Sequence, residues 1–435
     1  MAIFNSGNHS FERDLRQTVD WRLVLCYIGI VLIGWLSIYA SIHSTDPSSI
    51  FDLGCRSGKQ FVWIAVALVF DAAILFAVNP RLWEVIAPVA YLTVFLLLVL
   101  VIFVSKDVKG SHSWFELGPV KFQPAEVSKI TTSLMLALVM SRQGFRLTSR
   151  KGFLTVATTI GLPMLAILGE SETGSALVYV GYLFVLYREG LSGWWFVFLG
   201  AAIVLFILTL TAPWWAAALA LVLLCIVFFF YGSGFRMGKG LRMNHIARTL
   251  LVLTAGVALI FATDFLFNRV LQDHQRKRIE VLLGMKEDPA GVGYNVRQSM
   301  IAIGSGGLTG KGFLNGTQTT YGFVPEQSTD FIFCTIGEEF GFLGCLVLIL
   351  IYVALIYRLI ADAEKSREAF TRIYGYCVAS CLFMHLFINI GMTIGLMPVI
   401  GIPLPMLSYG GSSLLSFSVM IFIFLALNRQ EKKYF

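Results

Sequence analysis

Long apolar segments, separated by short polar ones, run through most of the 435 residues of this chain. A helix needs about 20 apolar residues to cross a bilayer core. By that measure the pattern predicts twelve spans, at roughly 21–43, 60–78, 82–104, 124–141, 153–169, 174–188, 194–212, 214–231, 248–267, 330–357, 373–396 and 405–428. The expected fold is therefore all-α, a polytopic membrane helical bundle that occupies residues 1–435 as a single domain.

One long polar stretch, 268–329, interrupts this pattern and is predicted to be a large extracytoplasmic loop. Lys and Arg gather in the short loops on the side of the two termini, and the positive-inside rule places that side in the cytoplasm. The large loop is basic as well. Either a loop of about 60 residues escapes the charge rule, or its basic residues form an anion-binding surface for a phosphorylated lipid headgroup.

Composition narrows the class of protein. Hydrophobic residues make up 57% of the chain and charged residues 14%, whereas soluble domains carry about 25% charged residues. A water-soluble enzyme and a nucleic-acid binder are therefore excluded despite the net charge of +7, and 14% aromatic residues exclude disorder. The seven cysteines form no Cys-x-x-Cys pair, so neither a disulfide framework nor a zinc site is expected. The N-terminus does not read as a cleavable signal peptide.

Two opposite charges open the fourth span. Pro124 suits the first position of a helix, and Glu126 and Lys129 are three residues apart, so they share one helix face. Charges within a span are expensive in lipid and must face a partner or a polar cavity. The pair is either an ion pair that neutralises itself or part of a polar cavity near the outer surface.

An acid opens the tenth span. Thr329 is predicted as its N-cap and Asp330 as the first helical residue, where the helix dipole stabilises a carboxylate. Asp330 could act as a general base, ligate a divalent cation or simply cap the helix. Glu338 and Glu339, about 12 Å deeper along the same helix, are interpreted as structural.

Two Gly-rich segments resemble binding loops. Residues 304–312 look superficially like a phosphate loop, but Ser305 and Gly312 replace residues that a Walker motif requires, so a flexible turn and no nucleotide are expected. The Gly/Pro-rich stretch 401–413 must be buried or line a cavity. Its backbone N–H groups and hydroxyls, including Ser412 and Ser413, could cradle an anion.

His385 and Asn389, on the span before that stretch, are expected to be hydrogen-bonding residues rather than metal ligands. The chain contains no Ser-x-x-Lys of the penicillin-binding type, no His-Glu-x-x-His and no Gly-x-Ser-x-Gly motif. Acyl transfer, zinc-dependent hydrolysis and ATP hydrolysis are therefore unsupported.

The chain strongly resembles the SEDS family, the shape, elongation, division and sporulation proteins. The segments that carry the resemblance are Trp114, QPAEVSKI at 123–130, DHQRKRI at 273–279, RQSMIAIGSGGLTGKGFLNGTQ at 297–318, VPEQSTDFIF at 324–333, GEEFG at 337–341 and NIGMTIGLMPVIGIPLPMLSYGGSSLL at 389–415. They cover the whole chain in order, and NGTQ at 315–318 resembles the elongation branch rather than the division branch.

The resemblance implies a peptidoglycan glycosyltransferase that polymerises lipid II during cell elongation. The acceptor's 4-hydroxyl would attack the anomeric carbon of an undecaprenyl-diphosphate-linked glycan, with inversion to a β-1,4 bond, at the outer face of the inner membrane. The family's essential aspartate falls on Asp330, as base or as ligand of a divalent cation, Mg²⁺ or Mn²⁺. Substrate-binding roles fall on Trp114, Glu126, Lys129, Lys59, Arg276, Arg278, Gln298, Ser412 and Ser413. The implied protein partners are a class B penicillin-binding transpeptidase and other elongation-complex proteins.

The chain departs from the family pattern at three places. The family has ten spans, so a helical hairpin is predicted to be inserted at 214–267. Glu172 replaces a shorter acid, and Lys59-Gln60 replaces Arg-Gln, which loses bidentate phosphate geometry. Two other functions stay open: a lipid II flippase, for which Asp71 in the second span is the main feature, and a non-catalytic scaffold of the wall-synthesis complex.

Overall fold

The computed structural model describes residues 19–43, 49–105, 113–117, 120–232, 239–286 and 291–434. The chain forms two compact units, the first made of Met1–Gly190 and Tyr294–Phe435 and the second of Leu191–Gly293. Both are helical, as the apolar pattern predicts.

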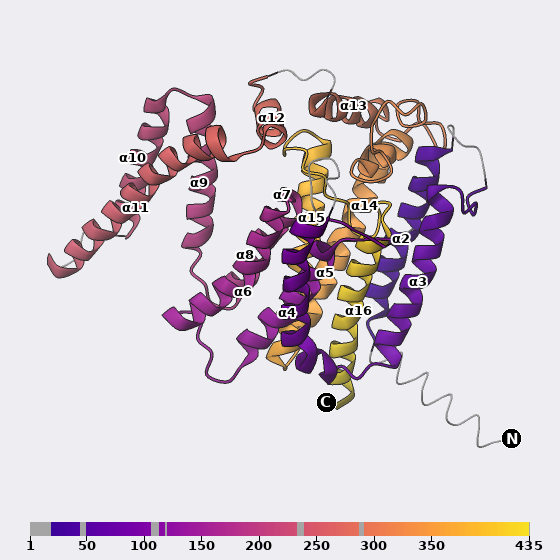
Figure 1. The fold of residues 1–435 in the computed structure, drawn as a ribbon, viewed down its shortest axis with the longest axis horizontal. Helices are drawn as coiled ribbons and strands as arrows, with labels where there is room; N and C mark the ends of the chain where they lie inside the picture. Colours follow the sequence, from indigo (N-terminus) through magenta and orange to yellow (C-terminus); the bar gives the residue numbers. More distant parts are fainter. Residues whose placement is uncertain are drawn as a thin grey trace. The chain divides into compact units, whose positions relative to one another are not determined.

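The first unit contains most of the helices (Figure 1): α2 (Trp21–Ile42), α3 (Arg56–Phe76), α4 (Arg81–Val104), α5 (Pro124–Ser141), α6 (Arg150–Gly169), α7 (Thr173–Val178), α8 (Tyr182–Arg188), α13 (Val292–Ser305, from Tyr294 on), α14 (Ile332–Lys365), α15 (Ala369–Thr393) and α16 (Gly411–Tyr434). A 3₁₀ turn, η1 (Tyr179–Gly181), joins α7 to α8. Two short antiparallel strands, β1 (Phe115–Leu117) and β2 (Val120–Phe122), precede α5.

Helix α5 lies inside this bundle although it is among the more polar helices. It packs against α4, α15 and α16, and its buried residues include Glu126, Ser128 and Lys129. Polar side chains of this kind are tolerated at membrane depth only where protein surrounds them. Helices α3 and α4 instead expose large apolar side chains, such as Val69 and Phe103, as lipid-facing helices do.

The second unit contains α9 (Trp194–Thr211), α10 (Trp214–Gly232), α11 (Lys239–Phe265), a π-helical turn η2 (Leu266–Val270) and α12 (Asp273–Leu282). Helices α9, α10 and α11 pack on one another around the buried residues Leu205, Leu221 and Cys225. The proposed insertion at 214–267 falls on two of these helices and stays a prediction.

Most predicted spans correspond to helices, with corrections to the bounds of four of them. The last span, predicted from residue 405, begins only at Gly411, the first residue of α16. Helix α3 begins at Arg56 rather than near residue 60. Helix α14 begins at Ile332, so Asp330 lies in the turn before the helix and is not its first residue. The span predicted at 174–188 is broken into α7, η1 and α8. Over the described residues, nine helices are long and apolar enough to cross a membrane, so the count of twelve stays a prediction.

Helix α14 contains a break that the loop 306–312 repairs. Gly341 has φ +64° and ψ −160°, which is not helical. Two backbone N–H groups of the loop donate to the carbonyls of Glu338 and Glu339, at 3.0 and 2.8 Å, and the N–H of Phe342 donates to a loop carbonyl at 2.9 Å. Irregular backbone at membrane depth needs such partners, so the loop and the helix form one structural element.

Candidate functional site

The turn that carries Asp330 faces Gly401. Asp330 is partly exposed, and its backbone oxygen accepts a hydrogen bond from Asn389 Nδ2 at 2.8 Å. A Cβ placed on Gly401 would lie 3.4 Å from Asp330 Oδ2, and Gly401 has φ +69°, which disfavours any side chain. Glycine therefore keeps the space beside this carboxylate open.

Side chains and backbone groups join the Asp330 turn to the loop 401–410. Asn389 Nδ2 also donates to the carbonyl of Ile402 at 2.6 Å. Ser408 Oγ donates to the carbonyl of Thr329 at 2.6 Å, and the Tyr409 N–H donates to a carbonyl in the turn at 2.8 Å. Most of the Gly/Pro-rich stretch after Gly401 is thus buried in protein, as predicted for irregular backbone at this depth, whereas Gly401 itself is exposed.

Helix α3 brings a guanidinium to the same turn. Arg56 donates a hydrogen bond to the Ser328 hydroxyl, two residues before Asp330, and its guanidinium lies 5.8 Å from the centre of the Tyr409 ring. One turn later, Gln60 Oε1 accepts the N–H of Gly410 at 3.3 Å. Sequence reasoning missed Arg56. The signal was its i, i+4 spacing from Gln60, which puts both on one helix face.

The other residue predicted on α3, Lys59, is exposed, and its side chain has no hydrogen bond or ion pair with the residues that the structure describes. It is three residues from Arg56, so the two are neighbours on the helix surface, but it does not share a face with Gln60, which is buried. A role for Lys59 in holding substrate stays a prediction.

The charges of α5 form a network of three residues. Lys129 Nζ lies 2.9 Å from Glu126 Oε2 and 2.9 Å from His385 Nε2, and all three side chains are buried. His385 Nδ1 lies 3.2 Å from the carbonyl of Pro403. Because that carbonyl can only accept, Nδ1 carries the proton and Nε2 accepts from the ammonium. The pair therefore does more than neutralise itself, since it connects α5 to α15 and the loop 401–410.

Trp114 reaches the same loop through its neighbours. It is partly exposed and precedes β1. The adjacent Ser113 hydroxyl donates to Glu172 Oε1 at 2.8 Å. At the start of α7, a Cβ on Gly174 would lie only 2.8 Å from the carbonyl of Ile400. The segment with Trp114, the start of α7 and the backbone before Gly401 are therefore linked by direct contacts.

A buried acid lies just before this link. Burial, followed by the negative charge of Glu172, raises the pKa of Glu170 to about 9. Residues 170–172 therefore hold one carboxylate bound to a hydroxyl, that of Glu172, and a second carboxyl, that of Glu170, whose raised pKa keeps it protonated at neutral pH.

Three further predicted residues lie on helices of the first unit. Ser413, in the first turn of α16, is buried, and its hydroxyl has no hydrogen-bond partner within the described part of the chain. Its neighbour Ser412 is partly exposed. Gln298 is partly exposed on α13, which the Ser299 hydroxyl attaches to the carbonyl of Thr393 at 2.9 Å. Their contacts with substrate stay predictions.

The basic cluster on α12 belongs to the second unit. Arg276 Nε lies 3.0 Å from Glu280 Oε1, and its guanidinium is 5.0 Å from the Phe267 ring centre. Lys286 Nζ lies 2.8 Å from Glu280 Oε2, and its hydrogen bond holds the pKa of that carboxyl below its usual value. Glu280 thus offsets part of the cluster's charge. That Arg276 and Arg278 face a diphosphate stays a prediction.

Glu338 and its loop have a structural role, as predicted. Glu338 accepts the N–H groups of Thr317, Gln318 and Thr319 at 2.7, 2.8 and 2.9 Å, and the Lys311 ammonium at 2.7 Å. The expectation of a flexible turn at 304–312 is wrong, because these bonds and the backbone pairing with α14 anchor it. Its lysine is bound to Glu338, so it does not serve as the lysine of a phosphate loop.

A divalent cation fits this site only with help from a substrate. Across the described residues, no three His, Cys, Asp or Glu side chains gather closely enough to form a metal cage. Asp330 offers one carboxylate. Mg²⁺ is often held by one or two carboxylates together with substrate phosphates, so the donor set fits an ion that arrives with a diphosphate.

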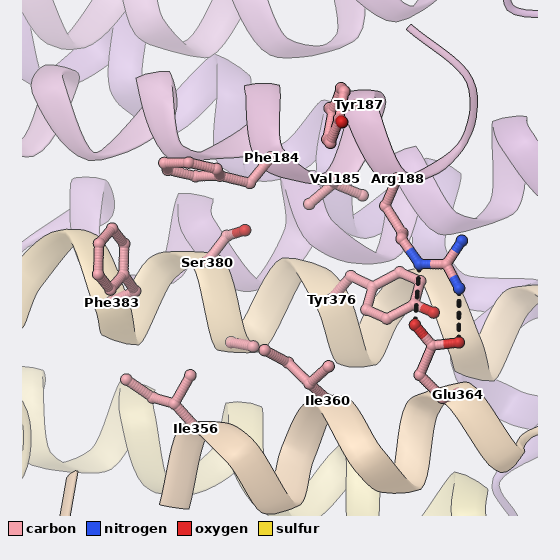
Figure 2. Close-up of a pocket in the computed structure, with 11 residues that line it drawn as sticks. Phe184, Val185, Tyr187, Arg188, Ile356, Ile360, Glu364, Tyr376, Ser380 and Phe383 are labelled. Atoms are coloured by element: carbon pink, nitrogen blue, oxygen red, sulfur yellow. Dashed lines mark hydrogen bonds and ion pairs between the residues drawn. The ribbon is translucent and has the colours of Figure 1, made fainter. Parts of the chain in front are cut away.

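A separate apolar groove lies at the far end of α14 from Asp330 (Figure 2). It has a volume of about 340 Å³ and runs over α15 between α8 and α14. Arg188 and Glu364 form a bidentate ion pair at one end of it, at 2.8 and 2.6 Å. Its apolar walls, including Phe184 and Phe383, offer no catalytic group, so the groove is not the candidate active site.

Comparison with known proteins identifies the family of this chain. The family model described as cell cycle protein, FtsW/RodA/SpoVE, matches residues 17–221 and 216–433. The peptidoglycan glycosyltransferase MrdB of Escherichia coli (strain K12) is 34% identical over 365 residues, 84% of this chain and 83% of that protein. The peptidoglycan glycosyltransferase RodA of Treponema pallidum (strain Nichols) is 29% identical over 439 residues, 95% of this chain and 98% of that protein.

Solved structures show the same fold. A chain from a peptidoglycan synthase complex that coordinates polymerization and crosslinking superposes with a TM-score of 0.67 at 25% identity, covering 95% of this chain and 98% of that one. The rod shape determining protein RodA of Thermus thermophilus gives a TM-score of 0.58 at 24% identity, covering 95% and 97%. The resemblance drawn from the sequence is confirmed: this chain is a membrane protein that belongs to the FtsW/RodA/SpoVE family of cell cycle proteins, the SEDS family.

Proposed function

We propose that this chain is a peptidoglycan glycosyltransferase that polymerises lipid II during cell elongation, at the outer face of the inner membrane, with both termini in the cytoplasm. Its relatives named MrdB and RodA are peptidoglycan glycosyltransferases. The chain covers more than four fifths of each of them, so the likeness extends over most of their length.

The observation that carries the proposal is the meeting of an acid and a guanidinium at one turn. Asp330 and the Arg56-bound Ser328 are two residues apart. Glycosyl transfer from a lipid diphosphate needs a base for the attacking hydroxyl and a cation for the departing diphosphate. Arg56 and Asp330 are the two groups suited to these tasks.

In the proposed reaction the acceptor's 4-hydroxyl oxygen forms a bond to the anomeric carbon of the donor. The bond from that carbon to the diphosphate oxygen breaks, and the diphosphate leaves with the electron pair. The hydroxyl proton passes to the carboxylate of Asp330. Arg56 binds the diphosphate charge, Trp114 offers an aromatic face to a sugar ring, and attack opposite the leaving group inverts the anomeric centre.

A divalent cation, Mg²⁺ or Mn²⁺, would be held by Asp330 and substrate phosphates, and it would supply charge neutralisation for the leaving diphosphate. The network of Glu126, Lys129 and His385 contacts the loop 401–410 through His385. It fixes the carbonyl of Pro403 and therefore the backbone beside Gly401, which keeps the space next to the carboxylate constant.

The test uses the purified full chain, lipid II and Mg²⁺ or Mn²⁺, with glycan strands separated by length. Asp330→Asn should lower the polymerisation rate at least about 100-fold, the smallest effect typical of losing a general base, while its melting temperature stays that of the parent. Asp52→Asn removes the charge of an exposed acid whose side chain caps only the Gly54 N–H, and it should polymerise normally. Comparable polymer from Asp330→Asn would exclude both the base and the metal-ligand role.

The guanidinium is tested separately. Arg56→Lys keeps the charge but loses bidentate phosphate geometry, and we expect its rate to fall about tenfold, with Arg56→Gln falling further. Lys59→Gln, on the exposed face of the same helix turn, is the matched control and should have the smaller effect. If Arg56→Gln and Lys59→Gln lowered the polymerisation rate equally, the diphosphate would be held by the general positive charge of this helix end and not by Arg56.

The partner is proposed to be a class B penicillin-binding transpeptidase with a single span that packs on the lipid-facing side of the bundle. One solved structure similar to this chain comes from a peptidoglycan synthase complex that coordinates polymerization and crosslinking. This chain has no penicillin-binding Ser-x-x-Lys motif, so a second protein would have to supply the crosslinking activity. Co-purification should recover the transpeptidase, and adding it should raise the polymerisation rate. No recovery and an unchanged rate would contradict this part of the proposal.

A flippase gains no support from its main candidate residue. Asp71 is buried, and its Oδ2 accepts hydrogen bonds from Tyr27 at 3.0 Å and Ser418 at 2.7 Å. These donors come from α2 and α16, so the acid joins three helices. A transported headgroup would have to displace these bonds, and the residues suited to its chemistry lie at the Asp330 turn.

A further inference from the structure

A polar cavity lies at the opposite end of the bundle from Asp330. It has a volume of about 370 Å³ and is formed where α3 ends, α4 begins and α16 ends. The distribution of Lys and Arg predicts that this end faces the cytoplasm. The residues that line it are Leu75, Phe76, Ala77, Val78, Asn79, Pro80, Arg81, Ala426, Arg429 and Gln430. None of them has a part in the proposed glycosyl transfer.

The charge of this cavity has one sign. Two arginines, Arg81 and Arg429, and two side-chain amides, those of Asn79 and Gln430, line it, and no acid is present among the described residues of its wall. Guanidinium groups bind phosphate in bidentate fashion, and amides add neutral donors. The wall therefore suits an anion with several oxygen atoms.

Arg429 is held in place by the fold. Its Nη1 donates to the carbonyl of Leu75 at 2.8 Å, and its guanidinium lies 5.4 Å from the centre of the Phe76 ring. The Leu75 carbonyl belongs to the last turn of α3, where carbonyls lack helical partners. The other guanidinium N–H groups have no partner within the described part of the chain. The side chain is thus oriented before any ligand arrives.

The start of α4 adds to this positive potential. The Asn79 side chain accepts the N–H of Arg81 at 3.1 Å and so fixes the first turn of the helix. Helix N-termini carry partial positive charge. Glu84, one turn along α4, and Glu368, at the start of α15, lie outside the wall of the cavity but reduce the net charge near Arg81. Arg429 is therefore the stronger of the two cationic groups.

We propose that this cavity binds the phosphate group of an anionic phospholipid of the cytoplasmic leaflet. A free phosphate would offer the same oxygens, but the cavity's own wall favours the lipid. Phe76 lines it with 51% of its surface exposed, next to the lipid-facing surface of α3. An apolar face beside two guanidinium groups matches a molecule whose phosphate continues into acyl chains.

The test is native mass spectrometry of the delipidated full chain, titrated with phosphatidylglycerol or phosphatidylcholine. The parent should bind one phosphatidylglycerol in preference to phosphatidylcholine. Arg81→Gln and Arg429→Gln should each weaken that binding about fivefold, the effect of one basic residue near a lipid surface. Arg146→Gln, which removes an exposed arginine from the loop between α5 and α6 on the same side, should not weaken it.

Each result decides the matter. Arg429→Gln also loses the Leu75 contact, so Arg81→Gln with an unchanged melting temperature separates lipid binding from folding. If all variants bound phosphatidylglycerol with equal affinity, or if Arg146→Gln lost as much affinity as Arg81→Gln, the lipid would be binding to diffuse surface charge and the proposed site would be wrong. If millimolar inorganic phosphate displaced the lipid, the proposal of a lipid ligand would be wrong, and the cavity would be assigned to a soluble anion. Polymerisation by Arg81→Gln in detergent should stay normal.

Discussion

Asp330 and Glu338 lie eight residues apart on one segment, and the fold treats the two carboxylates in opposite ways. Glu338 is completely buried, and its oxygens accept hydrogen bonds from backbone and side-chain groups of the loop at 305–319. Asp330 is partly exposed, and the fold holds it by its backbone oxygen, through Asn389. The carboxylate of Asp330 faces a glycine instead.

This difference separates a structural acid from a chemical one. A carboxylate has about four acceptor positions, and the chain itself occupies those of Glu338. A substrate hydroxyl would have to displace bonds that hold the loop to the helix. At Asp330 a hydrogen bond to the main chain takes part in the positioning, and Gly401 keeps room beside the carboxylate for a ligand.

The largest effect that this comparison predicts is a loss of stability when Glu338 is replaced. Glu338→Ala leaves several buried N–H groups and the Lys311 ammonium without their acceptor. We expect a loss of about 4 kcal/mol in the free energy of unfolding, as for a broken buried ion pair, measured by thermal denaturation in detergent. Limited proteolysis should then cut within 305–319.

The matched control is the adjacent buried acid. Glu339 accepts one backbone bond, from Leu314 at 3.1 Å, so Glu339→Ala should cost only about 1–2 kcal/mol. Asp330→Asn should cost at most about 1 kcal/mol, because the amide is isosteric and the side chain is partly exposed. If Asp330→Asn destabilised the chain as much as Glu338→Ala, the division between a structural and a chemical acid would be wrong.

The next prediction concerns the network behind the loop. Lys129→Met leaves the buried carboxylate of Glu126 without its cation, and we expect about 3 kcal/mol of destabilisation. The polymerisation rate should fall as well, since the same ammonium holds His385. The double variant Glu126→Gln/Lys129→Met removes the orphaned charge. It should recover stability but not the rate, and recovery of both would reduce the network to an ion pair.

The helices and the acid could be predicted from the sequence because both depend on local pattern. Helices α2 and α5 begin at the predicted residues, since long apolar runs and a proline at the first helical position are local signals. The start of α14 was predicted two residues too early. Thr329 and Asp330 are typical N-terminal residues, but bonds from Asn389 and Ser408 hold them in a turn.

The partners within the site could not be predicted, because they are far apart along the chain. Arg56 and Ser328 are separated by 272 residues, and Lys129 and His385 by 256. Periodicity shows which face of a helix a residue occupies but not what lies opposite. His385 was expected to form hydrogen bonds, which the structure bears out, but a cationic partner had no signal in its neighbourhood.

Replacing Trp114 is expected to change substrate affinity, by a smaller free energy than the losses of stability above. An aromatic face against a sugar contributes about 1 kcal/mol, so Trp114→Ala should raise the KM for lipid II about fivefold with little change in kcat. Trp114→Phe keeps an aromatic face and is the control. An unchanged KM in Trp114→Ala, with the melting temperature of the parent, would remove this residue from the substrate site and leave Ser113 and Glu172 as a purely structural link.

The smallest effect is a change in the pH dependence of stability at Glu170. Its pKa is about 9 in the folded chain against an ordinary 4.5, so the folded carboxyl keeps a proton that the unfolded one releases. Stability from this group is complete below about pH 4.5 and falls as the pH rises toward 9. Glu170→Gln cannot ionise, so its melting temperature should exceed that of the parent by an amount that grows from pH 6 to pH 9. Asp52→Asn, an exposed acid, should follow the parent at every pH. A constant offset between Glu170→Gln and the parent would mean that this carboxyl is already ionised in the folded protein, and that two charged acids, not one, lie beside the segment with Trp114.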